Sequence, residues 1–317
     1  MKGKLYIDGT DAYAKYGVFV VKGSYDDLVA LPSLKEPDKN DWPEEDGQEV
    51  DLSAPALNSE SVGITLGFTS NLIFNDFVNM LAEMGYHDFR FTDLGRTYRL
   101  RLSSQSSYEI SERLEIAKFG FENDFPRSAD YVYREPVSNI PMPGGYEIDD
   151  KDLSGYGISV LQGSLTEVLK SPAVKKNLLQ DFKNRDGAVY DGEAVRFQAK
   201  EVNIRCLMRA ESIESFWRNR DALLHDLSKV SAKTDSQGYE YRDAERRLFV
   251  ESLYESYPCY YKSCRTDDFA MTDGVWWEFT LTLVFTSFRV EEIEYLLAAE
   301  SGELIVTEDE QYYINLK

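Results

Sequence analysis

Residues that could do chemistry are few in this chain. The 317-residue sequence holds two histidines, His87 and His225, and three cysteines, Cys206, Cys259 and Cys264. Neither histidine has a second histidine or a cysteine pair at ligand spacing, so a zinc site lacks ligands of the right pattern. We therefore expect structural histidines, with His87 in a turn and His225 on a helix. The cysteines are too few and too unevenly placed for a disulfide framework.

Motifs for catalysis are also missing. The sequence contains no GxxxxGK[ST] loop, no strand followed by GxGxxG, no HExxH and no GxSxG. Two aspartate-rich turns, at 8–11 and 149–152, lack the alternating ligands and terminal glutamate of a calcium loop. Carboxylates are so abundant that any catalytic pair among them is unspecific. We expect that the protein is not an enzyme and that it holds no cofactor and no metal. A hydrolase that uses some of these carboxylates remains an alternative, behind the two functions named at the end of this section.

The net charge excludes several partners. With 35 lysines and arginines against 56 aspartates and glutamates, the formal charge is −21. Surfaces that clamp nucleic acid through its phosphates are basic, so we expect no binding of DNA or of an anionic membrane. The chain has no apolar run long enough to span a membrane and no signal-peptide pattern at its N-terminus. We expect it to stay in the cytoplasm where it is made, or to leave without a standard signal.

One stretch of sequence occurs twice, and the rest of the chain is organised around it. Residues 16–51 and 156–191 carry the same landmarks in the same order and at a constant offset. The matching pairs are Tyr16/Tyr156, Gly17/Gly157, Gly23/Gly163, Pro32/Pro172, Lys35/Lys175, Asp46/Asp186, Gly47/Gly187 and Asp51/Asp191. The register continues without a gap to Phe77 and Trp217. Ordered Gly, Pro and Asp-Gly landmarks predict a tandem duplication.

The duplication predicts two domains. We place the first domain at 1–126, a linker rich in proline and glycine at 127–145, the second domain at 146–290 and a C-terminal extension at 291–317. The extension is a candidate arm for a neighbouring subunit, with a frayed terminus as the alternative.

Periodicity predicts strands and one helix in the first copy. Alternation at Val62, Ile64, Leu66 and Phe68 is typical of a half-buried strand. A helix is expected over 72–84, capped by Ser70 or Asn71, and a helical turn over 25–31, capped by Ser24 and stopped by Pro32. Further strands are expected at 5–7, 17–21, 89–91, 98–102 and 114–121, the last with a bulge near Lys118.

The second copy repeats this order. Strands are expected within 195–207, a helix over 212–227 and longer hairpins from 239 to 257. The final strand points six apolar residues to one side: Val275, Trp277, Phe279, Leu281, Leu283 and Phe285.

Each copy carries a long polar loop. The loop between Lys35 and Asp51 holds one tryptophan and a run of acids, and its twin lies between Lys175 and Asp191. Loops of this length are uncommon in compact domains unless they have a function or a partner. We expect subunit-contact loops, with solvated loops anchored by one aromatic residue as the equal alternative. The candidate contact residues are Trp42, Glu44, Glu45, Asp46, Phe182 and Asp186.

The order of landmarks resembles the N-terminal domain of the distal tail proteins of tailed phages. It consists of YIDG at 6–9, YGV at 16–18, KGSY at 22–25, a Pro-Lys loop that ends in Asp46-Gly47, one helix and a final strand pair. That domain is similar to the tail-tube fold, and the resemblance covers each copy. It implies a mainly β (α+β) chain of two tandem β-sandwich or open-barrel domains, each with one flanking amphipathic helix. It also implies assembly into a ring around a DNA channel.

Two copies in one chain depart from a plain distal tail protein, as does the absence of an evident carbohydrate-binding insertion. Three chains would then complete a ring with pseudo-sixfold symmetry, with a hexamer as the other possibility. The resemblance implies a structural component of a phage or prophage tail tip or baseplate hub, in the virion tail and assembled in the bacterial cytoplasm. Its partners would be tube, tip or tape-measure proteins, and DNA would pass through the lumen without specific binding. The alternative function is a glycan-binding or adhesion β-sandwich, with Trp42, Trp276 and the tyrosine-rich hairpin as an exposed platform.

Overall fold

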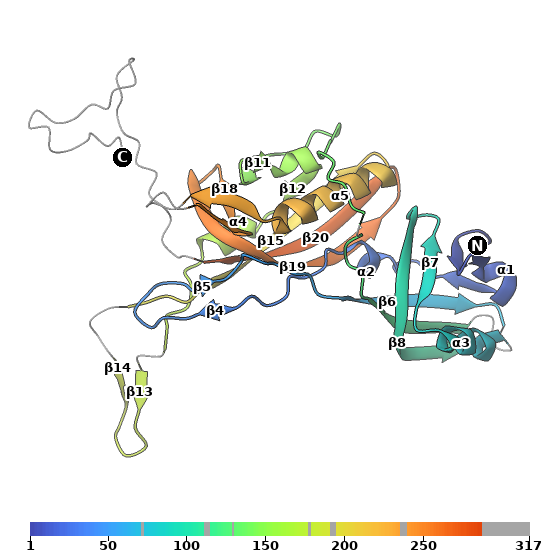
Figure 1. Ribbon diagram of the computed structural model, residues 1–317, viewed down its shortest axis with the longest axis horizontal. Helices are drawn as coiled ribbons and strands as arrows, with labels where there is room; N and C mark the ends of the chain where they lie inside the picture. Colours follow the sequence, from blue (N-terminus) through green and yellow to red (C-terminus); the bar gives the residue numbers. More distant parts are fainter. Residues whose placement is uncertain are drawn as a thin grey trace, which may run out of the picture.

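The computed structural model describes residues 1–70, 73–110, 115–128, 130–176, 179–190, 195–234 and 240–286. Asn71, one of the two expected helix caps, and the expected extension 291–317 lie outside these residues. Two seven-stranded antiparallel sheets lie side by side along the long axis of the molecule (Figure 1). The mainly β architecture with flanking helices is as predicted.

The first sheet has the strand order β2-β1-β7-β8-β9-β6-β3. Its helices are α1 (Ala12–Tyr16), α2 (Asp26–Val29) and α3 (Phe74–Glu83). Its strands are β1 (Leu5–Ile7), β2 (Thr10–Asp11), β3 (Val18–Val20), β6 (Glu60–Phe68), β7 (His87–Phe91), β8 (Arg96–Ile110) and β9 (Glu115–Asn123).

The connection from β2 to β3 forces this sheet to curl. These strands are the two edges of the sheet, yet only α1 and Gly17 separate them in the sequence. A helix of five residues is about 7.5 Å long, whereas the edges of a flat seven-stranded sheet lie about 29 Å apart. The edges must therefore approach each other, which gives the open barrel. Gly17, in the left-handed region at φ 59°, ends α1 and turns the chain into β3.

Apolar side chains fill the space between this sheet and α3. Val62, Ile64, Leu66 and Phe68 are all buried, as the alternation predicts. Phe77 of α3 packs edge-on against Phe68, with ring centroids 5.5 Å apart. Burial of each such side chain stabilises the fold by about 1.5 to 3 kcal/mol.

The second sheet has the equivalent order, β11-β10-β18-β19-β20-β15-β12. Its helices are the 3₁₀ helix η2 (Leu153–Tyr156), α4 (Ser164–Leu169) and α5 (Ile213–Ser228). Its strands are β10 (Tyr146–Ile148), β11 (Lys151–Asp152), β12 (Ile158–Val160), β15 (Lys200–Ala210), β18 (Arg246–Val250), β19 (Glu255–Ala270) and β20 (Val275–Phe285). A separate hairpin pairs β16 (Ser231–Thr234) with β17 (Glu240–Asp243).

The second sheet confirms the predicted helix and final strand. The Ser212 side chain accepts a hydrogen bond from the Ser215 amide at the start of α5, as a capping residue does. All six apolar residues expected to share a face of β20 are buried. Phe216 of α5 packs edge-on against Trp277, with centroids 5.7 Å apart.

Three local expectations were wrong. Ser24 does not cap α2; its hydroxyl donates to the Thr65 carbonyl oxygen and accepts from the Thr65 amide, which ties the loop to β6. Helix α3 begins at Phe74 without a side-chain hydrogen bond at its N-cap residue Ile73; the cap expected at Ser70 or Asn71 stays a prediction, because residues 71–72 lie outside the described residues. The bulge expected in the strand of Lys118 lies in its partner β8 instead: β9 pairs with β6 in unbroken register, and the register shift opposite Lys118 falls between Gln105 and Ser107. His87 is not in a turn; it begins β7, buried, with its Nδ1 2.6 Å from the Asp8 carboxylate.

No helix in the described ranges is both long enough and apolar enough to cross a membrane.

Candidate functional site

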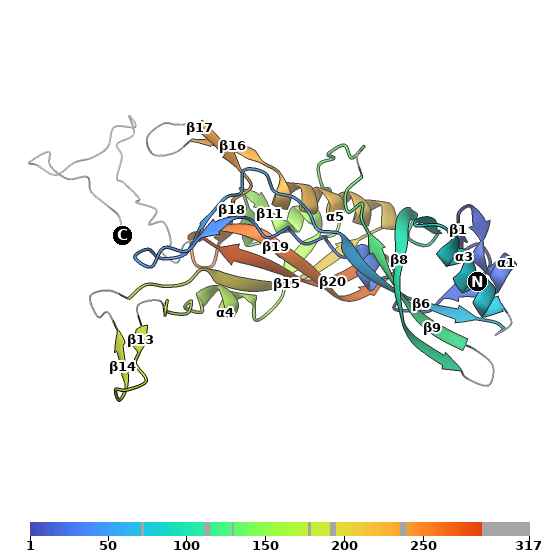
Figure 2. The same ribbon diagram turned by 60° about the horizontal axis from the view of Figure 1, so that its bottom comes forward.

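The loop predicted at 35–51 forms a hairpin that leaves its own sheet. Strands β4 (Lys39–Asn40) and β5 (Glu49–Val50) pair within it, and the hairpin lies along β19 and β20 of the other half (Figures 1 and 2). We call residues 35–51 the first hairpin. Just before it, the Leu34 amide donates to the Lys262 carbonyl oxygen of β19 at 2.9 Å.

The turn of the first hairpin is held by backbone hydrogen bonds at its Asp-Gly pair. The Gly47 amide donates to the Phe197 carbonyl oxygen at 2.9 Å, and the Phe197 amide donates to Asp46 Oδ1 at 2.9 Å. Gly47 adopts φ 77°, which a residue with a side chain rarely does. The next amide, of Gln48, donates to the Thr286 carbonyl oxygen at 3.3 Å. Asp46 is thus a contact residue between the two halves of one chain.

A buried lysine anchors the first hairpin from the other side. The side chain of Lys175 is 2% exposed, and its Nζ lies 2.6 Å from Asp41 Oδ1 and donates to the Trp42 carbonyl oxygen at 2.7 Å. Both contacts come from the first hairpin. A buried ammonium requires such partners, because its desolvation is costly.

The other predicted residues of this hairpin are less involved. Trp42 is half exposed, and its Nε1 donates to Glu49 within the hairpin. Glu44 and Glu45 are exposed, and their side chains form no hydrogen bond or ion pair with the described residues.

The twin hairpin has the same internal pairing but a different position. Strands β13 (Leu179–Asp181) and β14 (Ala188–Tyr190) pair in the register of β4 and β5. We call residues 175–191 the second hairpin, of which 175–176 and 179–190 are described and Asn177, Leu178 and Asp191 are not. It extends away from both sheets in Figures 1 and 2. The predicted contact residues Phe182 and Asp186 are both exposed there.

A second contact between the halves forms where α2 ends. Arg220 of α5 is 4% exposed; its Nε donates to the Val29 carbonyl oxygen at 3.2 Å, and its Nη2 donates to that of Ala30. The Tyr261 hydroxyl donates to the Pro32 carbonyl oxygen at 2.8 Å. The last carbonyls of a helix lack partners within the helix, so these side chains of the second half satisfy them.

A third contact surrounds Trp217 of α5. Its Nε1 donates to the Leu94 carbonyl oxygen at 2.6 Å, and the Arg96 guanidinium lies 3.8 Å from the ring centre. Arg96 also pairs with Asp221. The stacked cation and the ion pair therefore join β8 to α5 of the second half.

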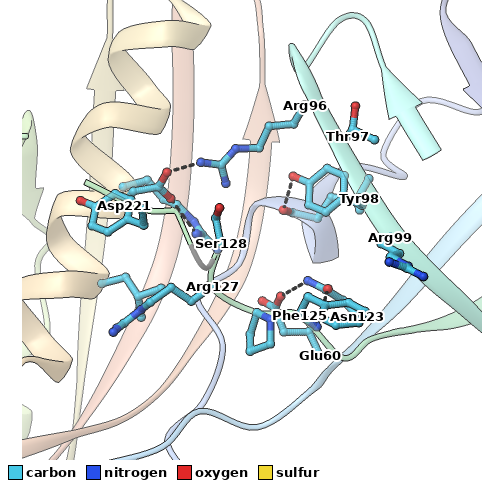
Figure 3. A pocket seen from close by; sticks show the side chains of 15 residues that line it. Glu60, Arg96, Thr97, Tyr98, Arg99, Asn123, Phe125, Arg127, Ser128 and Asp221 are labelled. Atoms are coloured by element: carbon cyan, nitrogen blue, oxygen red, sulfur yellow. Dashed lines mark hydrogen bonds and ion pairs between the residues drawn. The ribbon is translucent and has the colours of Figure 1, made fainter. Parts of the chain in front are cut away.

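A cavity of about 340 Å³ lies beside this contact, between the two halves (Figure 3). Glu60 and Asn123 face each other in it, and the Asn123 amide donates to Glu60 Oε2 at 2.8 Å. Burial raises the pKa of Glu60 to about 7, although Arg220 and the hydrogen bond from Asn123 act to lower it. Glu60 is thus a titratable group at the junction of the halves.

Sequence reasoning missed most of these contacts. Arg220 stands at helical spacing from Phe216, Trp217 and Leu223, on the stripe that packs inward. An arginine on an apolar stripe is rarely buried without a partner. The position of Arg220 on this stripe therefore indicated a buried contact with another part of the chain. The sequence showed Lys175 as the counterpart of Lys35 in the repeat, but it did not indicate that only one of the two lysines is buried.

Comparisons with known proteins identify no family. No protein-family model matches the chain, and no curated protein sequence matches it. Among solved structures, the chain is similar to the SPP1 Dit (gp 19.1) protein, described as a paradigm of the hub adsorption apparatus in Gram-positive infecting phages. The TM-score is 0.31 and the identity 11%, over 90% of this chain and 98% of that one.

Proposed function

We propose that the protein is a structural subunit of a ring at the tip or baseplate of a phage or prophage tail. The observation that carries the proposal is the first hairpin. One domain of the chain reaches over the next through a hairpin that contributes little to its own sheet, and the next domain carries an equivalent hairpin.

A contact of this kind is heterologous, since the hairpin side of one domain meets a different side of the next. Heterologous contacts build closed rings when the rotation closes and filaments when it does not. With domains at 1–126 and 146–290, three chains would present six similar positions, which fits the junction between a sixfold tube and a threefold tip. A hexamer of chains is the second arrangement.

The charge suits a passage for DNA. A formal charge of −21 repels phosphate, so DNA would cross the lumen without binding to it. In this role the chain would sit in the virion tail, assemble in the bacterial cytoplasm, and contact tube, tip or tape-measure proteins.

Burial weakens the alternative of a glycan-binding surface. The tyrosine-rich hairpin expected as an exposed platform buries Tyr257, Tyr260 and Tyr261, each less than 7% exposed. Trp276 is partly exposed, with the Arg209 guanidinium 3.9 Å from its ring centre, whereas Trp42 and Tyr254 are exposed. Aromatic rings that are covered by protein cannot stack on a sugar.

Two measurements test the proposal. Light scattering and negative-stain images of the purified chain should give a ring with a central hole. Immunogold labelling of virions from a producing host should place the chain at the tail tip. Labelling elsewhere in the virion, or a monomer that binds glycans on an array and forms no ring, contradicts it.

A further inference from the structure

We propose that the second hairpin docks on the first domain of another copy of this chain, through the contacts that the first hairpin makes within the chain. The occupant of this surface is therefore a second copy of the protein. The inference rests on the proposed ring and specifies the residues that would close it.

The two hairpins start from the same local structure. A bridge pairs Leu34 with Leu57 at the base of the first, and an equivalent bridge pairs Val174 with Phe197 at the base of the second. Around each bridge the same two backbone hydrogen bonds form, for example from Lys35 to Ala56 and from Lys175 to Arg196. The two hairpins therefore start from equivalent bases and share their internal pairing, while only the first lies against a neighbouring sheet within the chain.

The backbone groups that bind the turn of the first hairpin are hydrogen-bonded in the second domain, whereas the equivalent groups of the first domain have no such bond within the described ranges. Phe197 in the second domain gives both its amide and its carbonyl to the Asp46-Gly47 turn. The equivalent residue, Leu57, uses neither in any hydrogen bond with the part of the chain that the structure describes. Leu57 is only partly exposed, and unpaired backbone groups away from water are costly. The first domain thus has no hairpin turn bound at Leu57 among the described residues, whereas the second domain has one bound at Phe197.

A cavity lies where the turn of a second hairpin from another copy would bind. It measures about 310 Å³ and is lined by Leu57, Asp124 and Phe125, among others. Asp124 follows β9 as Thr286 follows β20, since Asn123 pairs with Glu60 and Phe285 pairs with Lys200. Leu57 and Asp124 are therefore the counterparts of Phe197 and Thr286, the two residues whose carbonyls accept from Gly47 and Gln48.

The anchoring lysine shows the same asymmetry. Lys175 is 2% exposed because the first hairpin covers it with Asp41 and Trp42. Its counterpart Lys35 is exposed and has no ion pair among the described residues. Asp181, the counterpart of Asp41, is exposed as well. A second hairpin seated on a neighbouring first domain would bring the Asp181 carboxylate to the Lys35 ammonium.

Apolar side chains near the base of the second hairpin are exposed, whereas their counterparts near the first hairpin are buried. Val29 is 0% exposed and Leu34 is 8% exposed, since the second domain lies over them. Their counterparts Leu169 and Val174 are 58% and 40% exposed. Burying two such side chains would stabilise the contact by about 3 to 6 kcal/mol before the entropy cost of association.

One substitution separates the two contacts. Arg196, which lies 3.8 Å from Asp46, stands where the first domain has Ala56. Asp186 would therefore bond the Leu57 amide without an arginine beside it. Because the docked hairpin would have no equivalent of the Arg196–Asp46 ion pair, Lys35–Asp181 is its one equivalent of the two ion pairs that the first hairpin makes with Lys175 and Arg196.

Charge reversal tests the docking in the full chain. Lys35→Glu and Asp181→Lys should each shift the assembled protein to monomer by light scattering, at least tenfold in dissociation constant. The double variant should recover assembly, because every contact then holds the reversed pair. Lys2→Glu and Glu83→Lys, which are exposed and carry the same charge changes, should leave the mass unchanged. Circular dichroism and the free energy of unfolding of the monomer confirm that each variant folds.

Cross-linking gives the geometry. Lys35→Cys combined with Asp181→Cys should form disulfides between chains on mild oxidation and yield a ladder of covalent dimers and trimers. A fast-migrating monomer with an internal disulfide would overturn the inference, since the hairpin would then fold back on its own chain. Rings that survive both charge reversals and do not cross-link would also overturn it, yet they would leave the proposed tail function standing.

Discussion

Replacing Lys175 by methionine tests whether the buried lysine holds the first hairpin on the second domain. Methionine keeps the length and packing of the stem but removes the ammonium. The loss comprises the charged hydrogen bond to the Trp42 carbonyl, about 1.5 to 3 kcal/mol, and an ion pair with the half-exposed Asp41, below about 1 kcal/mol. Relief from burying a charge offsets part of this. We expect the hairpin to open more easily by about 2 kcal/mol.

Hydrogen exchange at the Gly47 and Gln48 amides measures that opening directly, because both amides donate across the contact. A change of 2 kcal/mol corresponds to about 30-fold faster exchange at these positions. The matched control is Lys35→Met, which changes an exposed lysine at the equivalent position and should alter exchange at Gly47 by less than threefold. Equal effects of the two substitutions, or no effect of the first, would refute the assignment of Lys175 as the anchor.

Two further changes test the junction and the turns. Burial raises the pKa of Glu60 from 4.5 to about 7, so its contribution to stability is complete below about pH 4.5 and is lost as the pH rises through about 7. Urea unfolding of Glu60→Gln should lose this dependence and gain up to about 3 kcal/mol at pH 8. Gly157→Ala should lower the thermal midpoint more than Gly163→Ala. Both glycines have positive φ, but only at Gly157 would the new Cβ meet a backbone atom, the Arg209 carbonyl oxygen at 2.5 Å.

The strands that face one core were predictable because burial on one side imposes a period of two on the sequence. The alternation in 62–68 and 275–285 satisfied that condition over several pairs of residues, and no competing period fits them. Ser24 shows the limit of local rules. A serine before a short helix is typical of a cap, but here the hydroxyl has a better partner in the extended backbone of β6 at Thr65. That partner is 41 residues away and cannot be read from the neighbouring sequence.

The direction of the hairpins could not be predicted, for a related reason. Lys35 and Lys175 occupy equivalent positions in the two matched stretches, yet one is exposed and the other is 2% exposed. The difference arises from connectivity, because within one chain only the second sheet follows a sheet that carries a hairpin. The matched positions give the two hairpins the same internal pairing, whereas the order of the two halves decides which contacts are made within the chain.

That argument leads to a test of how many chains close the ring. In an equal mixture of Lys35→Glu chains and Asp181→Lys chains, each variant finds a compatible neighbour only in the other variant, so the two must alternate. Alternation closes only in rings with an even number of chains. A ring of three should fail to close in the mixture, although the double variant closes, and light scattering should show open chains of several lengths in place of one mass. Full recovery of a single closed species in the mixture would contradict the three-chain ring and favour six, because six positions can alternate and three cannot.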